Sequence, residues 1–208
     1  MGAQNEAWRL LDMVAVIPTY DDSGYATRVI LADGTEVLTG LKPRAIMRTA
    51  LLMVGITWKG YVAQYQATRS GAQTIPVVHP PFAFMTAQMC KPKVQGDGLY
   101  GYVRLDKIDE LGHILGSTGR KGEIRLFSGE VLATSQKCVT VQYHFDRAAG
   151  EFLKAVTRQR FERMQLREQR RTDVRLRQAR RELEERMARQ DRRDLAEQME
   201  SSTEPGVD

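Results

Sequence analysis

The point at which apolar residues stop recurring divides this chain more sharply than any other feature of its sequence. Five apolar residues fall at offsets of 0, 4, 7, 11 and 15, the spacing of one helical face: Val141, Phe145, Ala148, Phe152 and Val156. From about Thr157 the same face carries charged residues. Because a charged face cannot be buried without partners, we expect a helix that leaves the folded body at this position.

Arginine dominates the segment that follows. Residues 158–193 contain fourteen arginines and seven acids, which gives +7, while the last fifteen residues contain five acids and no base. Only three apolar residues in this segment approach heptad spacing, namely Leu176, Leu183 and Met187. They are too few for a coiled coil. Three segments are therefore predicted: a domain over residues 1–156, a charged helical extension over 157–200 held by i,i+4 ion pairs, and a disordered acidic tail over 201–208.

The first part of the domain predicts one buried strand and one helix. Residues 13–17 are strand-like, and Pro18 is expected to end the strand. Pro43 suits the first position of a helix, and Gly55 suits the residue just past its end. A helix is therefore predicted over residues 43–54.

Two hairpins are predicted around the pairs Asp33-Gly34 and Ser128-Gly129, because glycine readily adopts the positive φ that such turns require. The hairpin strands are expected over residues 25–31, 35–39, 123–127 and 130–134. Four more short strands are expected over residues 61–68, 75–78, 82–85 and 100–105. The predicted fold class is α+β: a mainly antiparallel, twisted sheet with a short helix and a long C-terminal helix.

Several classes of protein are disfavoured by the residues that are present. No apolar run approaches the roughly 20 residues that span a bilayer, so we expect neither membrane insertion nor export. Cys90 and Cys138 lie far apart and outside CxxC spacing, which is typical of free thiols in a reducing cytoplasm. The histidines, His79, His113 and His144, show no zinc-ligand spacing. We expect no metal, no cofactor and no enzymatic activity.

The charge distribution favours a polyanionic partner, although composition alone slightly favours a solvated charged helix without one. Lys42, Arg44 and Arg48 form the first candidate site. Arg44 and Arg48 lie four residues apart and therefore on one helical face, beside a helix N-terminus whose N–H groups favour phosphate. A solvated face of an amphipathic helix is an equally good interpretation.

Two further groups of basic residues are candidates. Arg120 and Lys121 lie in a glycine-rich segment, residues 112–122, which lacks the GxxxxGK[ST] pattern of a nucleotide-binding loop. A flexible basic loop that contacts phosphates and a plain connecting loop explain this segment about equally well. The third group begins the Arg-rich extension and consists of Arg158, Arg160 and Arg163.

Short segments occur in a characteristic order along residues 12–156: Ala15-Val-Ile-Pro18, Lys42-Pro43 with Ile46, Gly55 and Gly60, residues 65–68, Pro76-Val-Val-His-Pro80, residues 82–84 and 100–105, Phe127-Ser-Gly129, and Ser135 with Gln142 and Arg147-Ala148. Their order and spacing resemble the ComK family of competence transcription factors. Three features depart from that pattern: Tyr61 in place of a basic residue, residues 85–98, and the Arg-rich tail.

The resemblance implies a DNA-binding transcription factor that activates genes for competence and DNA uptake. It implies binding to paired AT-rich boxes of double-stranded DNA, chiefly through the minor groove, as a homo-oligomer in the cytoplasm at the nucleoid. A narrow A·T-rich minor groove attracts arginine, which is compatible with this composition. It also implies a protease adaptor as a partner, although the tail differs from that of the family.

Two other functions are compatible with the same residues. An RNA-binding or ribosome-associated protein would use the Arg-rich helix as its main contact. A protein-assembly factor would hold protein partners on that helix and show little salt-sensitive affinity for nucleic acid.

Overall fold

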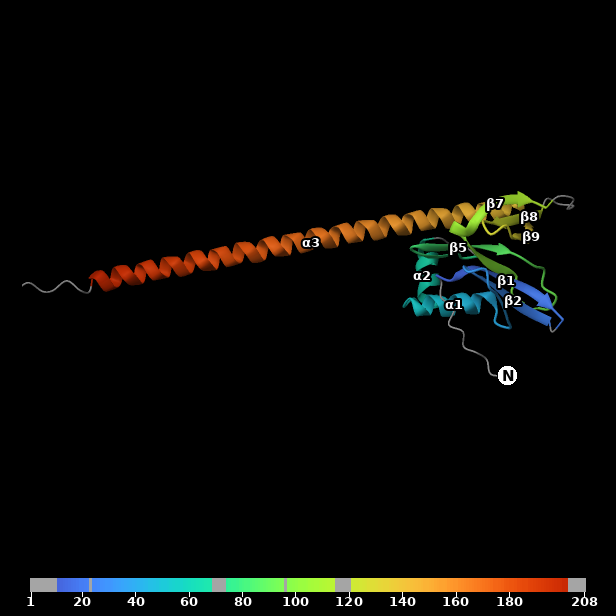
Figure 1. Ribbon diagram of the computed structural model, residues 1–208, viewed down its shortest axis with the longest axis horizontal. Helices are drawn as coiled ribbons and strands as arrows, with labels where there is room; N and C mark the ends of the chain where they lie inside the picture. The colour runs from blue at the N-terminus through green and yellow to red at the C-terminus, as the bar shows by residue number, and fades with distance from the viewer. Residues whose placement is uncertain (1–10, 23, 69–73, 96, 115–120, 202–208) are drawn as a thin grey trace, which may run out of the picture. The chain divides into compact units, whose positions relative to one another are not determined.

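The computed structural model describes residues 11–22, 24–68, 74–95, 97–114 and 121–201 (Figure 1). Residues 1–156 form one compact unit and residues 157–208 a second. In the described part, antiparallel strands and two short helices precede one long helix, which confirms the predicted α+β class.

The larger sheet holds six antiparallel strands in the order β3-β2-β1-β6-β5-β4. The strands are β1 (Met13–Asp21), β2 (Gly24–Leu31), β3 (Glu36–Thr39), β4 (Val77–His79), β5 (Phe82–Gln88) and β6 (Tyr100–Arg104). The strands predicted over residues 75–78, 82–85 and 100–105 are thus confirmed as β4, β5 and β6. Because β6 returns to pair with β1, the two middle strands come from distant parts of the sequence.

Pro18 does not end the first strand, which corrects the sequence prediction. β1 continues to Asp21, and Pro18 lies opposite Thr27 of β2. The ladder between β1 and β6 involves Ala15 and Val16, so Pro18 lies beyond it. A residue without an N–H is tolerated where pairing with one neighbour has already ended.

A second antiparallel sheet has the order β7-β8-β9. Its strands are β7 (Ile108–His113), β8 (Lys121–Leu126) and β9 (Val131–Lys137), and a single 3₁₀ turn (Leu105–Lys107) precedes them. The sequence did not predict β7, because Asp109, Glu110 and Gly112 disfavour a strand. Pairing with β8 at Ile108 and from Glu110 to His113, with an irregularity between them, overrides that preference.

The two predicted hairpins are confirmed. The Asp33-Gly34 turn joins β2 to β3, and the Ser128-Gly129 turn joins β8 to β9. Gly34 has φ of 85° and Gly129 has φ of 86°, values that residues with a Cβ rarely adopt.

Helix α1 (Pro43–Met53) forms where the sequence predicts a helix, with its proline at the start. At its end, the N–H of Ile56 donates to the Leu51 carbonyl (3.0 Å) and the N–H of Gly55 to the Leu52 carbonyl (2.9 Å). This pair of bonds, with φ of 78° at the glycine, is the Schellman arrangement. Gly55 therefore ends α1 as expected.

The segment predicted as a strand over residues 61–68 is helical, and that prediction is wrong. Helix α2 spans Trp58–Thr68. The Thr57 hydroxyl caps its first turn by accepting a backbone N–H (3.2 Å). Its aromatic residues are typical of strands, but helical spacing places Tyr61 and Tyr65 on one face. There Tyr65 is buried, and the Tyr61 hydroxyl accepts an N–H from β4 (2.8 Å).

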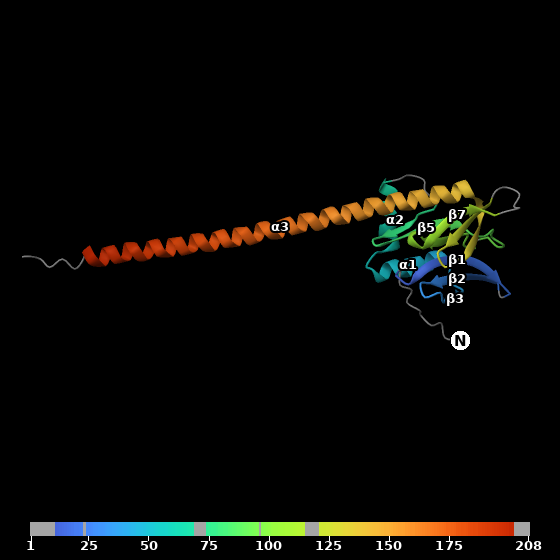
Figure 2. The same cartoon turned by 45° about the horizontal axis from the view of Figure 1, so that its top comes forward.

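The six-stranded sheet, which Figure 2 draws from a second side, separates two apolar cores. On one face, residues of the sheet pack with residues of α1: Met13, Val16, Val29, Phe84 and Tyr102 with Ile46, Met47, Ala50 and Leu51. On the other face, sheet residues pack with β8, β9 and the start of helix α3 (Cys138–Ser201): Ile17, Met85 and Val103 with Ile124, Leu126, Leu132, Val141 and Ala148. We call α1 and α2 the helical layer, and β7 to β9 the strand layer.

Helix α3 changes its surroundings along its length. Val141 and Ala148 are fully buried, and Phe145 packs against the same core. In the second unit, by contrast, all side chains of residues 160–178 are exposed. None of the described helices is both long enough and apolar enough to cross a bilayer.

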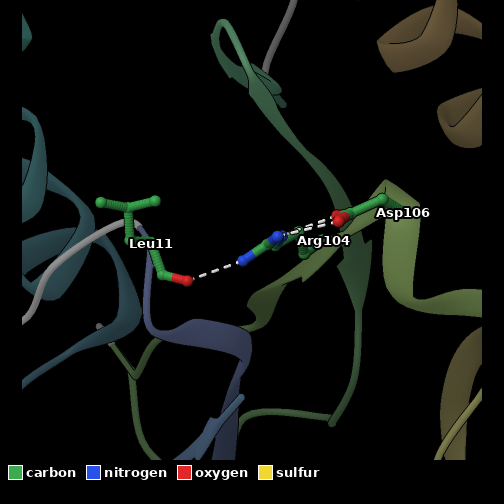
Figure 3. Close-up of polar contacts among 3 residues, drawn as sticks. All are labelled: Leu11, Arg104 and Asp106. Carbon is green, nitrogen blue, oxygen red and sulfur yellow. Dashed lines mark hydrogen bonds and ion pairs between the residues drawn. The ribbon is translucent and has the colours of Figure 1, made fainter.

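Arg104, at the end of β6, is buried and hydrogen-bonded to two residues (Figure 3). Its guanidinium donates two hydrogen bonds to the Asp106 carboxylate (2.6 and 2.8 Å) and one to the Leu11 carbonyl (2.8 Å). It also lies over the ring of Phe82, 4.7 Å from the centroid. Such a bidentate, planar arrangement suits arginine. Arg104 therefore connects the residues before β1 to those after β6.

Candidate nucleic-acid interface

Positive charge is concentrated in one stretch of the first unit. Residues 37–96 contain no aspartate or glutamate, but they contain seven basic residues: Lys42, Arg44, Arg48, Lys59, Arg69, Lys91 and Lys93. The first unit as a whole carries +3, so its remaining residues carry −4. The described part of this stretch includes the whole helical layer. Such an excess of positive charge in one stretch favours an anionic partner.

Helix α1 presents two of these cations on one exposed face. Arg44 and Arg48 are exposed, while Ile46 and Met47 between them are fully buried. Four-residue spacing aligns the two guanidinium groups along the helix. Lys42, at the N-cap, is exposed and lies beside the first turn, which contains no acidic residue. The structure thus places Lys42 and Arg44 at the N-terminal end of α1 and Arg48 about one turn further along the same helix.

Helix α2 adds an aromatic ring and a fourth cation. The Arg44 guanidinium lies over the Trp58 ring, 5.2 Å from its centroid, an attractive cation–π contact. Arg48 and Lys59 both line a groove of about 590 Å³ between α1 and α2. Within the described residues, Arg44, Arg48 and Lys59 form no ion pair with a carboxylate. Their charges are therefore available to phosphate.

The second predicted site is only partly described. Arg120 lies outside the described residues. Lys121 is the first residue of β8, which corrects its placement in a flexible loop, because the N–H of Ile114 donates to the Lys121 carbonyl (2.9 Å) and extends the hairpin. Lys121 is paired in register with Lys137 of β9, and both are exposed. This pair lies in the strand layer, so it is not part of the surface formed by α1 and α2.

The third predicted site lies on α3 in the second unit. Arg158, Arg160 and Arg163 are all exposed. Spacing of three residues places Arg160 and Arg163 on one face, whereas Arg158 and Arg160, two apart, do not face each other.

The same helix continues this face as a stripe of arginines. Arg163, Arg167, Arg171 and Arg175 follow one another at intervals of four residues, and all are exposed. Like charges at this spacing destabilise an isolated helix by a few tenths of a kcal/mol per pair. Among the described side chains of this unit, the ion pair Arg180–Glu184 (2.9 Å) lies beyond the stripe. A bound polyanion would offset the repulsion along it.

The described residues place no three His, Cys, Asp or Glu side chains where they could hold a metal ion. His144 is half-buried, and burial, assisted by the charge of Arg147, lowers its pKa. Its Nε2 lies 3.4 Å from Nε2 of Gln136. Burial likewise raises the pKa of the Cys90 thiol, with a smaller contribution from Asp97. Both groups are therefore held towards their neutral forms.

Trp58 and Lys59 are the residues of this candidate interface that the sequence prediction missed. The sequence prediction placed them in the connection between a helix over residues 43–54 and a strand over residues 61–68. It therefore did not indicate that they lie beside α1. The absence of acids from residues 37–96 was the signal that could have found them. Comparisons with protein-family models, curated proteins and solved structures gave no match for this chain.

Proposed function

We propose that this chain is a DNA-binding transcription regulator whose helical layer contacts the phosphates of a duplex. The observation that carries the proposal is the exposed positive charge of Arg44 and Arg48 on α1 and of Lys59 on α2, which pairs with no carboxylate among the described residues and lies within sixty residues that contain no acid. Exposed cations fixed on helices contact the phosphate backbone at low entropic cost. Such contacts set the position of a protein on DNA without reading its sequence.

Preference among DNA sequences has to come from other groups. An arginine that enters a narrow A·T-rich minor groove senses the width of the groove. With the ComK resemblance, this supports an activator of competence and DNA-uptake genes that acts on AT-rich promoter sites in the cytoplasm. Arg120 and Lys121, and the arginines of the second unit, are the candidates for that role. Binding as a homo-oligomer and control through a protease adaptor belong to the same proposal.

The test is a titration of the purified full-length chain against AT-rich and GC-rich duplexes across a salt series. Each phosphate contact releases counterions and adds about 0.9 to the slope of log affinity against log salt. We expect a steep slope and tighter binding to the AT-rich duplex. Affinity that is insensitive to salt would overturn the proposal, and tighter binding to a structured RNA would favour the RNA-binding alternative.

Two variants separate positioning from sequence preference. Replacing Lys42, Arg44 and Arg48 with alanine should weaken binding to both duplexes about equally and flatten the slope by roughly 2.7. Replacing Arg120 and Lys121 should instead reduce the preference for the AT-rich duplex. If neither variant binds more weakly and removal of residues 158–208 abolishes binding, the second unit alone carries the activity.

A further inference from the structure

A cavity of about 400 Å³ opens beside the start of α1. Its volume falls within the roughly 300–1,000 Å³ that is typical of small-molecule sites. Its walls come from the N-terminal end of α1, from α2 and from the sheet. The lining residues that bear on its chemistry are Lys42, Arg44, Trp58, Val62, Tyr100 and Tyr102.

The charge of the lining favours an anion. Lys42 and Arg44 contribute two cations, and no acidic side chain is among the described residues that line the cavity. The acid nearest to the lining in sequence is Asp97, and its carboxylate accepts hydrogen bonds from the Tyr20 hydroxyl and the Val94 N–H. The charge of Arg44 also reaches Tyr102, where it opposes the effect of burial, which raises the pKa of that phenol to about 12.

The remaining walls favour a flat aromatic ring. Trp58, Tyr100 and Tyr102 all line the cavity. The Nε1–H of Trp58 is buried, and no described residue accepts its hydrogen bond. A buried donor without an acceptor is costly, so an acceptor on a ligand would be favoured there. Stacking on such rings is available to any nucleobase.

We propose that this cavity binds a nucleotide unit, that is, a planar base carrying a phosphate. Lys42 and Arg44 hold the phosphate, and the aromatic wall holds the base. The unit comes either from a free mononucleotide or from an unstacked nucleotide of a single strand. Because Lys42 and Arg44 also belong to the duplex interface, occupation of the cavity competes with duplex binding; this last step rests on the proposed function.

Binding is measured through the fluorescence of Trp58. The chain has two tryptophans, so Trp8→Phe leaves Trp58 as the single fluorophore in the full-length protein. AMP and a single-stranded octanucleotide are the two probes, and adenosine and inorganic phosphate are the matched partial ligands. We expect saturable quenching by AMP or by the octanucleotide. Adenosine and phosphate should each bind about tenfold more weakly, since each lacks one half of the unit.

Two variants on this background separate the cavity from the duplex interface. Val62→Phe fills the cavity without changing charge, so it should abolish quenching by either probe and leave duplex affinity unchanged. Arg48→Ala with Lys59→Ala removes cations that do not line the cavity, so nucleotide binding should persist while the salt slope of duplex binding falls by about 1.8. Circular dichroism checks that each variant is folded.

Each outcome decides the inference. Quenching by AMP assigns the site to a free nucleotide, and quenching by the octanucleotide alone assigns it to a strand. Absence of quenching by both probes, equal binding of phosphate and AMP, or quenching that survives in folded Val62→Phe overturns the nucleotide site. If wild-type protein binds no duplex but Val62-dependent quenching persists, the proposed function fails and the cavity assignment stands.

Saturating AMP supplies the test of competition. It should lower the salt slope of duplex binding by about 1.8, because two phosphate contacts are withdrawn. Inorganic phosphate at the same ionic strength is the control and should leave the slope unchanged. If AMP binds without changing the slope, competition is overturned and the cavity remains as a nucleotide site.

Discussion

Arginine is used differently in the helical layer and in the rest of the first unit. Outside the helical layer, three of the four described arginines face carboxylates: Arg104 bonds to Asp106, Arg28 pairs with Glu36 and Glu130, and Arg125 pairs with Glu110 and Glu123. The fourth, Arg147 of α3, lies over the Tyr65 ring of α2. In the helical layer, Arg44 lies over a tryptophan ring and no carboxylate is close enough to pair with Arg44 or Arg48 among the described residues.

The difference separates two roles of positive charge. A cation beside a carboxylate is already neutralised and contributes to the fold, as the Arg28 pairs show by joining β2 to the β3 strand and to the β8–β9 turn. A cation beside an aromatic ring keeps its charge and is held in place by the contact. The helical layer is thus suited to binding a polyanion, whereas the arginines that are paired with carboxylates help to hold the sheets together.

The largest expected effect comes from removing the start of α3 from the strand layer. A chain that ends before Cys138 lacks Val141 and Ala148, which are fully buried, and should lose its cooperative thermal transition. A chain that ends at Thr157 keeps them and should unfold cooperatively. Thermal denaturation followed by circular dichroism compares the two. If the chain that ends at Thr157 were molten or aggregated, residues after Thr157 would be shown to stabilise the first unit.

A smaller effect is expected from the buried arginine. Arg104→Met retains the aliphatic stem over Phe82 but removes the bonds to Asp106 and Leu11. The free energy of unfolding should fall by about 2–4 kcal/mol, because buried charge-assisted bonds are lost. Below the unfolding temperature, the salt slope of duplex binding should stay that of the wild type. A flatter slope in the folded variant would mean that this arginine also contacts the partner.

The smallest effect concerns pH and His144. Burial lowers its pKa, so the folded chain binds fewer protons than the unfolded chain below the ordinary histidine value of about 6.5. The free energy of unfolding therefore decreases as the pH falls below about 6.5. The decrease ends once the pH is below the pKa of His144 in the folded chain. His144→Gln should show a weaker fall in thermal midpoint between neutral and mildly acidic pH. Parallel curves for the two proteins would contradict this account.

Local chemistry explains which parts of the fold could be predicted. Gly34, Gly55 and Gly129 each adopt positive φ where the sequence placed a turn or a helix end. The strand predicted over residues 61–68 failed because aromatic content outweighed the cap at Thr57, and packing of the tyrosines decided the structure. Residue types alone do not show how segments meet in space.

In the candidate site too, local properties could be predicted from the sequence and the packing of segments could not. The sequence placed Arg44 and Arg48 on one helical face, which is a local property. It could not place Trp58 and Lys59 beside them, because that contact depends on how α2 packs against α1. Nor could it identify Arg104 as structural, since Asp106 lies two residues away in sequence but Leu11 and Phe82 meet Arg104 only in the folded chain.

The most direct test removes two charges from each region and compares the slopes of duplex binding against salt. Arg44→Gln with Arg48→Gln changes the helical layer, and Arg125→Gln with Lys154→Gln changes two cations that are paired with carboxylates. Both variants lose the same net charge. We predict that the first pair flattens the slope by about 1.8 and the second leaves it unchanged. Equal slopes for the two variants would contradict the account, since only overall charge would then matter.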